Sequence, residues 1–301
     1  MAPGARARSL GGGAAGAGLS SCAPTGQVGA RRQGAAAELR DNPGTAGDPV
    51  GAFCHSCPMI ESILLAAAAI GTHRGDRHLS NASGFFFERD ERLFLVSSRH
   101  VLRDDASGHQ PDRLTIDIHT DPDNVAECVG FSVPLYRDGR ALWRQGSDEA
   151  GEVDVAVIEL KRDALPEDAC LAAFTPAHLL ADLDGVEVGT PLLVIGFPLG
   201  FGDELHRLPV ARQAIVASSF GLRFQGSGYF LTDARTHRGI SGAPVVMRAA
   251  KPGKGMGELP WHLLGIHSAR LDMGSRDHAA DEALGLNCAW YADMLMTLTE
   301  G

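Results

Sequence analysis

The chain has 301 residues, of which 44% are hydrophobic and 21% are charged, and its formal net charge at pH 7 is -10. These values are typical of a globular protein that can bury a sizeable core. The acidic balance excludes a nucleic-acid binder that depends on phosphate contacts, and the absence of any run of about 18 apolar residues argues against a membrane-spanning helix.

Residues 1–58 are rich in Ala, Gly and Arg and show no aliphatic periodicity. Such a segment cannot bury enough apolar surface to offset the entropy lost on ordering it. We therefore expect a disordered leader. Met59 directly precedes sequence with a folded pattern, which suggests the hypothesis that the native protein starts at Met59 and that the start at residue 1 is mis-assigned.

The six cysteines do not form a dense disulfide framework. A chain of this length can be stabilised by its core, so we expect reduced thiols and, without a convincing signal peptide, a cytoplasmic protein. "CHSC" (54–57) is a CxxC pair without a second ligand pair and is weak evidence for a zinc or redox site. The histidines show no HExxH or paired-ligand spacing, so no metal and no cofactor is predicted.

From residue 63 onward the pattern is that of β-strands. "ILLAAAAIG" (63–71) predicts a first buried strand, because it lies far from residue 1 and no positive segment directly precedes it. Short β-branched or aromatic runs between turn signals predict further strands at 84–88, 93–98, 114–120, 153–160, 191–197, 212–220, 228–233, 243–248 and 262–269. Many short strands at such intervals favour barrels or a sandwich over a βαβ sheet.

Two segments predict helices. "TPAHLLADLDG" (175–185) offers Thr175 as N-cap, Pro176 at the first helical position and Gly185 as a stop. "CAWYADMLMTLTE" (288–300) repeats apolar residues at helical spacing. The part of the chain after the leader, 59–301, therefore divides into three. These are a first β half at about 59–160, a connector at 161–190, and a second β half with a C-terminal helix at 191–301.

Ser241 lies in "TDARTHRGISGAPVV" (232–246) and is a candidate nucleophile. Gly239 leaves room for its backbone N–H to face an oxyanion beside the N–H of Ser241, and Gly242 permits a tight turn. A catalytic serine also needs a base and a group that orients the base. A serine flanked by glycines occurs by chance, so the motif alone is weak.

The chain contains suitable partners for such a serine. His100 directly follows an apolar strand in "FLVSSRHVL". Asp154 begins an apolar strand in "GEVDVAVIEL", where one carboxylate stands among valines. A buried carboxylate without a partner is costly, and a histidine N–H is a natural partner for it.

The blocks "SSRHVL", "DVAVIEL" and "TDARTHRGISGAPVV" resemble the three catalytic blocks of trypsin-like, chymotrypsin-fold serine peptidases, in particular compact bacterial members. The order His100, Asp154, Ser241 is that of the triad in this fold. The resemblance covers roughly 59–295 and implies two antiparallel six-stranded β-barrels, with the site in the cleft between them. Ile240 and Ala243 depart from the family, which frequently has Asn or Asp, and Gly or Ser, at these positions.

The resemblance implies a serine endopeptidase that forms an acyl-enzyme intermediate on a protein or peptide substrate. His100 is then the general base and later acid, and Asp154 orients it. Ser241 attacks the scissile carbonyl, and the N–H groups of Gly239 and Ser241 form the oxyanion hole.

The specificity pocket of this fold is shaped by residues just before the nucleophile and by a later strand. Here these are Arg235, Thr236 and "GIHSA" with His267. A "GIH" strand together with Thr236 resembles glutamyl endopeptidases, which implies a preference for Glu, Asp or Gln before the scissile bond. The alternative is that His267 is a satisfied core histidine and Arg235 points to solvent.

Two other functions stay open at this point. One is a catalytically silent protease-fold module that binds peptides or a partner protein, and the other is a small redox or zinc protein that uses "CHSC". The presence of all three candidate triad residues favours the enzyme. The sequence predicts no nucleic-acid or membrane partner and leaves the oligomeric state open.

Overall fold

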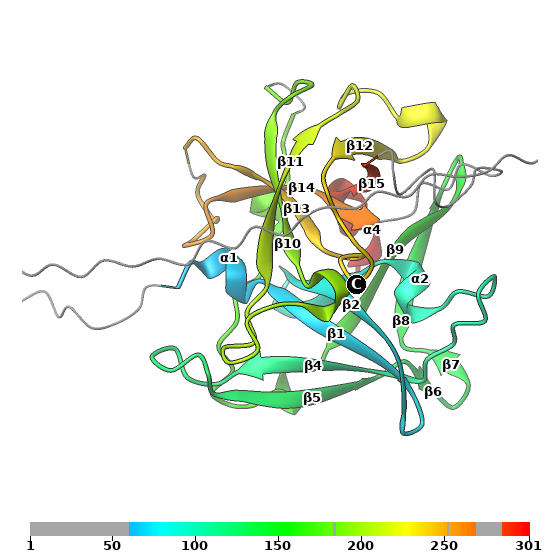
Figure 1. Cartoon of the computed structure of the whole chain (residues 1–301), viewed down its shortest axis with the longest axis vertical. Helices are drawn as coiled ribbons and strands as arrows, with labels where there is room; N and C mark the ends of the chain where they lie inside the picture. The colour runs from blue at the N-terminus through cyan, green and yellow to red at the C-terminus, as the bar shows by residue number, and fades with distance from the viewer. Residues whose placement is uncertain (1–59, 183–184, 252, 269–284) are drawn as a thin grey trace, which may run out of the picture. The chain divides into compact units, whose positions relative to one another are not determined.

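The structure is a computed structural model that describes residues 60–182, 185–251, 253–268 and 285–301 (Figure 1). These residues belong to one unit of the chain, Cys54–Gly301. The predicted leader and the "CHSC" pair lie outside the described residues. Within the described residues, no helix combines the length and the apolar character that a membrane crossing requires.

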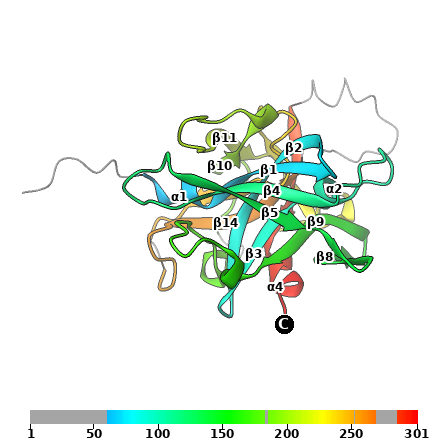
Figure 2. The same ribbon diagram turned by 90° about the horizontal axis from the view of Figure 1, so that it is seen from below.

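The first half of the described chain forms a seven-stranded antiparallel sheet in the order β5-β4-β1-β2-β3-β9-β8. Figure 2 shows β1, β4 and β5 side by side, as their pairing requires. Two short helices, α1 (Ser62–Leu65) and α2 (Arg99–Leu102), and a small β6–β7 ladder (Tyr136–Arg137 with Arg140–Ala141) complete this half. The seven strands are β1 (Ala67–Arg74), β2 (Arg77–Arg89), β3 (Arg92–Ser97), β4 (Arg113–His119), β5 (Cys128–Pro134), β8 (Trp143–Asp148) and β9 (Gly151–Leu160).

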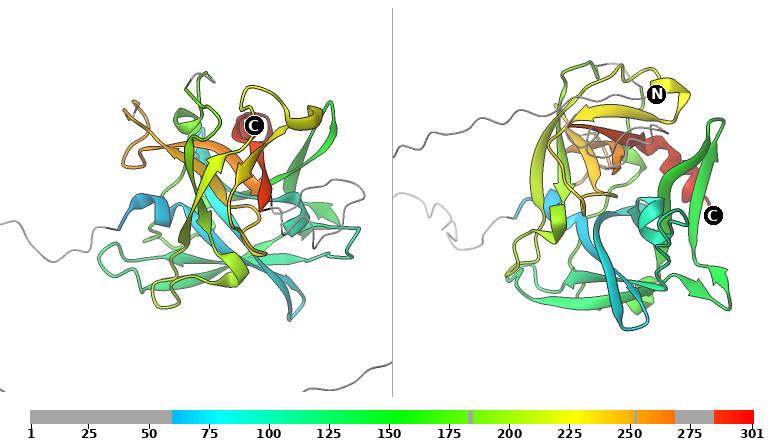
Figure 3. Two further views of the ribbon diagram at one scale, coloured as in Figure 1. Left: turned by 45° about the horizontal axis from the view of Figure 1, so that its top comes forward. Right: turned by 45° about the vertical axis from the view of Figure 1, so that its right-hand side comes forward.

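The second half is a closed six-stranded antiparallel barrel in the order β10-β11-β12-β15-β14-β13. Its strands are β10 (Pro191–Gly196), β11 (Val210–Val216), β12 (Tyr229–Asp233), β13 (Pro244–Arg248), β14 (Trp261–Ser268) and β15 (Leu286–Tyr291). The final helix, α4 (Leu295–Leu298), lies beside the β8–β9 hairpin (Figure 3), where the Arg144 guanidinium donates to the Leu298 carbonyl at 3.5 Å.

The predicted fold class, all-β and chymotrypsin-like with a C-terminal helix, is confirmed. In detail, the second half is a closed six-stranded barrel, as predicted, whereas the first half is a seven-stranded sheet instead of a second six-stranded barrel. Each run from 84–88 to 262–269 that is predicted as a strand overlaps a strand of the described chain, although 212–220 extends beyond the end of β11. The first prediction, 63–71, is wrong at its start, where α1 precedes β1. The sequence pattern missed β5 and β8, which are the two edge strands of the sheet and carry mostly exposed or half-exposed residues.

The helix predicted at 288–300 is confirmed only in its last part, and the one predicted at 175–185 is wrong for the residues that the structure describes. In the segment 288–300, the first residues belong to β15, which pairs with β12 and β14, and only Leu295–Leu298 is α-helical. Apolar runs this short do not distinguish a strand from a helix, and pairing on both sides decides for the strand. Among its described residues, the segment 175–185 has one 3-10 turn, Pro176–His178, which is closed when the Thr175 N–H donates to Nδ1 of the buried His178 at 2.8 Å.

The two halves share one core. Phe85, Val96 and Val155 of the sheet pack in the same cluster as Ile195 and Leu263 of the barrel. Apolar packing therefore holds the two halves together, and such packing contributes about 25 cal/mol per Å² of buried apolar surface.

Phe174 attaches the connector between the halves to the sheet. Its side chain is fully buried and packs edge-on against Phe85, with ring centroids 5.6 Å apart. Its N–H donates to the Phe86 carbonyl at 2.9 Å, and its carbonyl accepts the Glu88 N–H at 2.7 Å.

The substitution Phe174→Ala is expected to lower the free energy of unfolding by about 3–5 kcal/mol, because it leaves a cavity in the core. Phe201→Ala, at a side chain that is 68% exposed, is the matched control and should change the same quantity by less than about 0.5 kcal/mol. Urea denaturation of both variants measures the difference. Equal effects of the two substitutions would contradict the assignment of Phe174 to the core.

Candidate active site

His100 and Asp154 meet through two hydrogen bonds. His100 lies on α2, the turn that follows β3, and Asp154 lies on β9, the neighbour of β3 in the sheet. The His100 Nδ1 is 2.7 Å from Oδ2 of Asp154, and the His100 backbone N–H donates to Oδ1 at 2.9 Å. An ionised carboxylate only accepts hydrogen bonds, so Nδ1 carries the proton and Nε2 of the neutral imidazole keeps its lone pair. The pair therefore presents a base at Nε2.

A third donor, Ser268, reaches the same carboxylate from the barrel. Its Oγ donates to Asp154 Oδ2 at 2.9 Å. Partial burial pushes the pKa of Asp154 upward, but the hydrogen bonds and charge of His100, together with the hydrogen bond from Ser268, outweigh it and hold the pKa below the ordinary value. Asp154 is thus ionised at neutral pH. Ser268 is not predicted from the sequence, where its only signal is its place directly after His267.

Ser241 lies just before β13, and its residue is only 6% exposed. The N–H of Gly242, the next residue, donates to the His267 carbonyl at 2.8 Å. The same carbonyl accepts Oγ–H of Ser98, two residues before His100, at 3.3 Å. The serine segment is therefore tied to the turn that carries His100. In the described part of the chain, no hydrogen bond joins the Ser241 hydroxyl to His100.

Two backbone N–H groups around Ser241 make no hydrogen bond to the described part of the chain. The N–H groups of Ile240, Gly242 and Ala243 donate to carbonyls of the chain, whereas those of Gly239 and Ser241 donate to none among the described residues. Gly239 and Gly242 have φ angles of 91° and 88°, which L side chains rarely adopt. This conformation leaves the N–H groups of Gly239 and Ser241 available to an anionic oxygen.

Gly242 also has no room for a side chain. A Cβ there would lie 2.2 Å from both the Ser83 carbonyl oxygen and Ser97 Oγ. The loop of Ser241 therefore packs backbone against backbone on the first sheet.

His267 is fully buried on β14, and within the described ranges neither of its ring nitrogens has a hydrogen-bond partner. Burial, with a smaller contribution from His100, lowers the pKa of His267 to about 3. The interpretation of His267 as a satisfied core histidine therefore does not hold for the part of the protein that the structure describes.

The other predicted pocket residues take different positions. The Thr236 hydroxyl donates to Asn287 Oδ1 at 2.6 Å, and Asn287 in turn donates to the Ala234 carbonyl at 2.7 Å. Arg235 is exposed, and only its backbone carbonyl is engaged, by the guanidinium of Arg212. The structure thus gives Thr236 a fixed orientation and leaves the Arg235 side chain in solvent.

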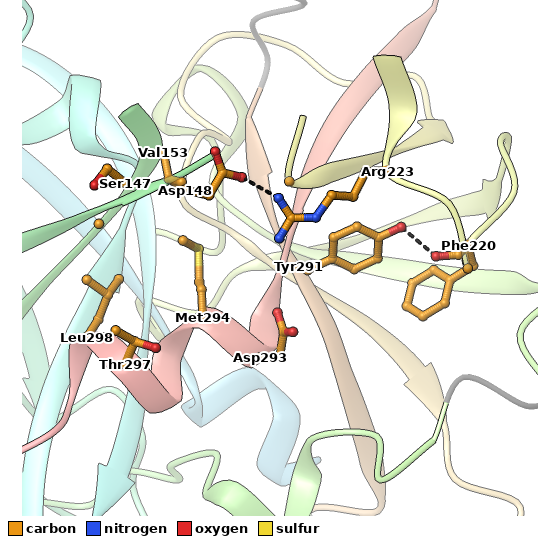
Figure 4. Close-up of a pocket in the computed structure, with 13 residues that line it drawn as sticks. Ser147, Asp148, Val153, Phe220, Arg223, Tyr291, Asp293, Met294, Thr297 and Leu298 are labelled. Carbon is orange, nitrogen blue, oxygen red and sulfur yellow. Dashed lines mark hydrogen bonds and ion pairs between the residues drawn. The ribbon is translucent and has the colours of Figure 1, made fainter. Parts of the chain in front are cut away.

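A separate cavity of about 410 Å³ lies between the β8–β9 hairpin, the loop before β12 and the C-terminal segment (Figure 4). Val153 lines it, and Asp148 pairs with Arg223 at 2.9 Å on its wall. The hydroxyl of Tyr291 donates to the Phe220 carbonyl. None of the three candidate catalytic residues lines this cavity, so it is distinct from the site.

Comparison with protein-family models matches residues 82–251 to the family described as the trypsin-like peptidase domain, and the matched segment contains His100, Asp154 and Ser241. The chain belongs to this family. It is therefore a hydrolase of the serine protease class. Comparison with curated protein sequences finds no significant match.

Two solved structures are similar to this trypsin-like peptidase domain at low sequence identity. The serine endoprotease from Yersinia pestis is 16% identical, with a TM-score of 0.43, and the match covers 78% of this chain and 62% of that protein. The Rv3671c protease from M. tuberculosis in its active form is 15% identical, with a TM-score of 0.43, and the match covers 87% of this chain and 92% of that one.

The burial of His267 predicts a pH dependence of stability. Its folded pKa is about 3, whereas in the unfolded chain it is about 6.5. Between these pH values the unfolded chain binds one more proton at this residue. The free energy of unfolding therefore falls as the pH drops from about 6.5 toward 3, by up to about 1.4 kcal/mol per pH unit from this group.

His267→Leu removes the titrating group, so its free energy of unfolding should depend less steeply on pH in this window, by up to about 1.4 kcal/mol per pH unit. Ile266→Leu, a change of the preceding buried residue, is the control and should keep the slope of the unchanged protein. Denaturant titrations between pH 4 and 7 give both slopes, and identical slopes for the two variants would contradict the prediction.

Proposed function

We propose that this protein is a serine endopeptidase that hydrolyses peptide bonds through an acyl-enzyme intermediate on Ser241. The observation that carries the proposal is the pair of His100 and Asp154, joined by two hydrogen bonds. Hydrogen bonds also connect the turn of His100 to the segment of Ser241, where the N–H groups of Gly239 and Ser241 have no partner among the described residues. Membership of the trypsin-like peptidase domain family supports it.

In the proposed reaction, Oγ of Ser241 attacks the scissile carbonyl carbon while its proton passes to Nε2 of His100. The oxyanion accepts hydrogen bonds from the N–H groups of Gly239 and Ser241. Asp154 keeps the imidazole in the tautomer with Nδ1–H and stabilises the imidazolium. The C–N bond then breaks as the imidazolium gives its proton to the leaving amine. Water, deprotonated by His100, releases the acyl group as a carboxylic acid and restores the serine.

The Ser241–His100 hydrogen bond has to form during this cycle. Such contacts are often long without substrate and tighten when it binds. The buried Ser241 is held by its carbonyl, which accepts the Ser83 N–H at 3.0 Å, so its backbone stays in place while the hydroxyl turns.

Ser241→Ala removes the nucleophile, so the catalytic rate should fall by about 10⁶. A fluorophosphonate probe should label the unchanged protein and not this variant. Ser219→Ala, at an exposed serine of the same barrel, is the control and should be labelled fully. A folded protein that takes no label and cleaves no peptide would instead support the silent, peptide-binding module.

We further propose that the enzyme prefers Glu, Asp or Gln before the scissile bond. The buried His267 imidazole has no partner among the described residues. Leaving a buried polar group unsatisfied is costly, and a substrate carboxylate or amide would supply the missing hydrogen bond. The hydroxyl of Thr236, fixed by Asn287, is a second polar group at the predicted pocket position.

Cleavage of a peptide library tests this preference. We expect the most efficient cleavage after Glu, Asp or Gln, and a loss of that preference by about 10-fold or more in His267→Leu, because a missing hydrogen bond to a charged group costs about 1.5–3 kcal/mol. Fluorophosphonate labelling should persist in this variant. Arg235→Ala should change the preference only a few-fold, since exposed ion pairs contribute about 0–1 kcal/mol. A preference for Arg, Lys or large apolar residues would defeat the proposal.

A further inference from the structure

One buried side chain of the first sheet, that of Ser83, is hydrogen-bonded to the loop that contains Gly239 and Ser241. Ser83, on β2, is fully buried. Its Oγ donates to the Gly239 carbonyl at 2.8 Å and accepts the Phe197 N–H at 2.9 Å. Its own N–H donates to the Ser241 carbonyl at 3.0 Å. Ser83 therefore holds both ends of the tripeptide Gly239–Ser241.

The carbonyls of this loop determine where its N–H groups point. The C=O and N–H of a trans peptide unit point in opposite directions. The Arg238 carbonyl accepts the Leu199 N–H at 2.5 Å, so the Gly239 N–H of the same unit faces the other way. The Ile240 carbonyl accepts the Ala243 N–H at 3.0 Å. The Ser241 N–H belongs to the same peptide unit as this carbonyl, so it points in the opposite direction, away from Ala243.

Ser83 acts on this arrangement by two routes. It bonds the carbonyl of Gly239 directly, at a residue whose positive φ gives its backbone wide freedom. It also accepts the N–H of Phe197, which directly precedes the short turn Pro198–Gly200. The Leu199 N–H that fixes the Arg238 carbonyl comes from that turn. The hydroxyl thus joins both sides of the loop to one point on β2.

We propose that Ser83 is a positioning residue whose hydroxyl keeps the N–H group of Gly239 directed at the oxyanion of the transition state. The inference rests on the proposed function of the same site. Ser83 does not touch the reacting atoms; it acts through the loop. Its loss should therefore weaken binding of the tetrahedral transition state and leave binding of the ground-state substrate nearly unchanged.

The test is Ser83→Ala, assayed on a peptide substrate. We expect kcat to fall by about 10- to 100-fold, because a misplaced oxyanion donor loses much of its effect, with KM within about twofold. A peptide aldehyde, whose adduct oxygen occupies the oxyanion hole, should bind more weakly by the same factor as kcat. A peptide with a reduced –CH2–NH– bond in place of the scissile amide should bind as before.

Thr72→Val is a closely matched control. Thr72 is also fully buried in the first sheet, and its Oγ1 likewise donates to one carbonyl, that of Ser80 at 3.1 Å, and accepts one backbone N–H, that of Ser80 at 3.0 Å. It does not contact the loop of Ser241. This variant should lose thermal stability as Ser83→Ala does, with kcat and aldehyde affinity unchanged.

Unchanged kcat and aldehyde affinity in Ser83→Ala would overturn the proposal, and so would an equal loss of affinity for the aldehyde and the reduced peptide. If Ser83→Ala does not fold, Ser83→Cys replaces it, because a thiol keeps a weaker donor at the same position. This variant should show a smaller loss of kcat and of aldehyde affinity with unchanged affinity for the reduced peptide. Wild-type values of kcat and aldehyde affinity in Ser83→Cys would overturn the proposal. Failure of the proposed function is seen separately, as no fluorophosphonate labelling and no cleavage by the unchanged protein, and the inference then falls with it.

Discussion

The carboxylate of Asp154 is the constraint on which the rest of the site depends. Three hydrogen bonds reach it, two from His100 and one from Ser268. His100 belongs to the turn after β3, whereas Ser268 belongs to β14 of the barrel. An enclosed charge is stable only when donors surround it. Because these donors come from both halves of the fold, satisfying one carboxylate aligns the sheet, the barrel and the imidazole together.

A second constraint is steric, and it acts on the other side of the site. Gly242 lets the loop of Ser241 lie directly on the backbone of β2 and β3, closer than any side chain would allow. This approach buries polar backbone groups, and Ser83 and Ser97 make hydrogen bonds to them. Oγ of Ser83 donates to the Gly239 carbonyl, and Oγ of Ser97 donates to the Ser83 carbonyl at 2.8 Å. The loop is therefore positioned by contact and by hydrogen bonding at once, which is how a functional loop is held rigidly.

The sequence predicts well the features that local pattern determines. β3 and β9 are mostly buried, so the apolar runs "LFLVSS" and "VDVAVIEL" predict them as strands. These two strands determine the positions of His100 and Asp154. The edge strands β5 and β8 need no apolar pattern and were missed. The helix predicted at 288–300 fails because β12 and β14 pair with its first part. Ser83 and Ser268 were missed because their partners lie 156 and 114 residues away in sequence, and only the folded chain brings them together.

The backbone and the side chain of His267 have separate roles if the proposed specificity holds. Its backbone carbonyl accepts Ser98 Oγ–H and the Gly242 N–H, so the main chain belongs to the framework that holds the serine loop. Its side chain is left without a partner in the described chain. Buried polar groups are satisfied almost everywhere in folded proteins, so under the proposed specificity the imidazole of His267 is available to a hydrogen-bonding group of the substrate. Since the framework uses only backbone atoms at this position, a different side chain could change what the pocket recognises without moving Ser98 or Gly242.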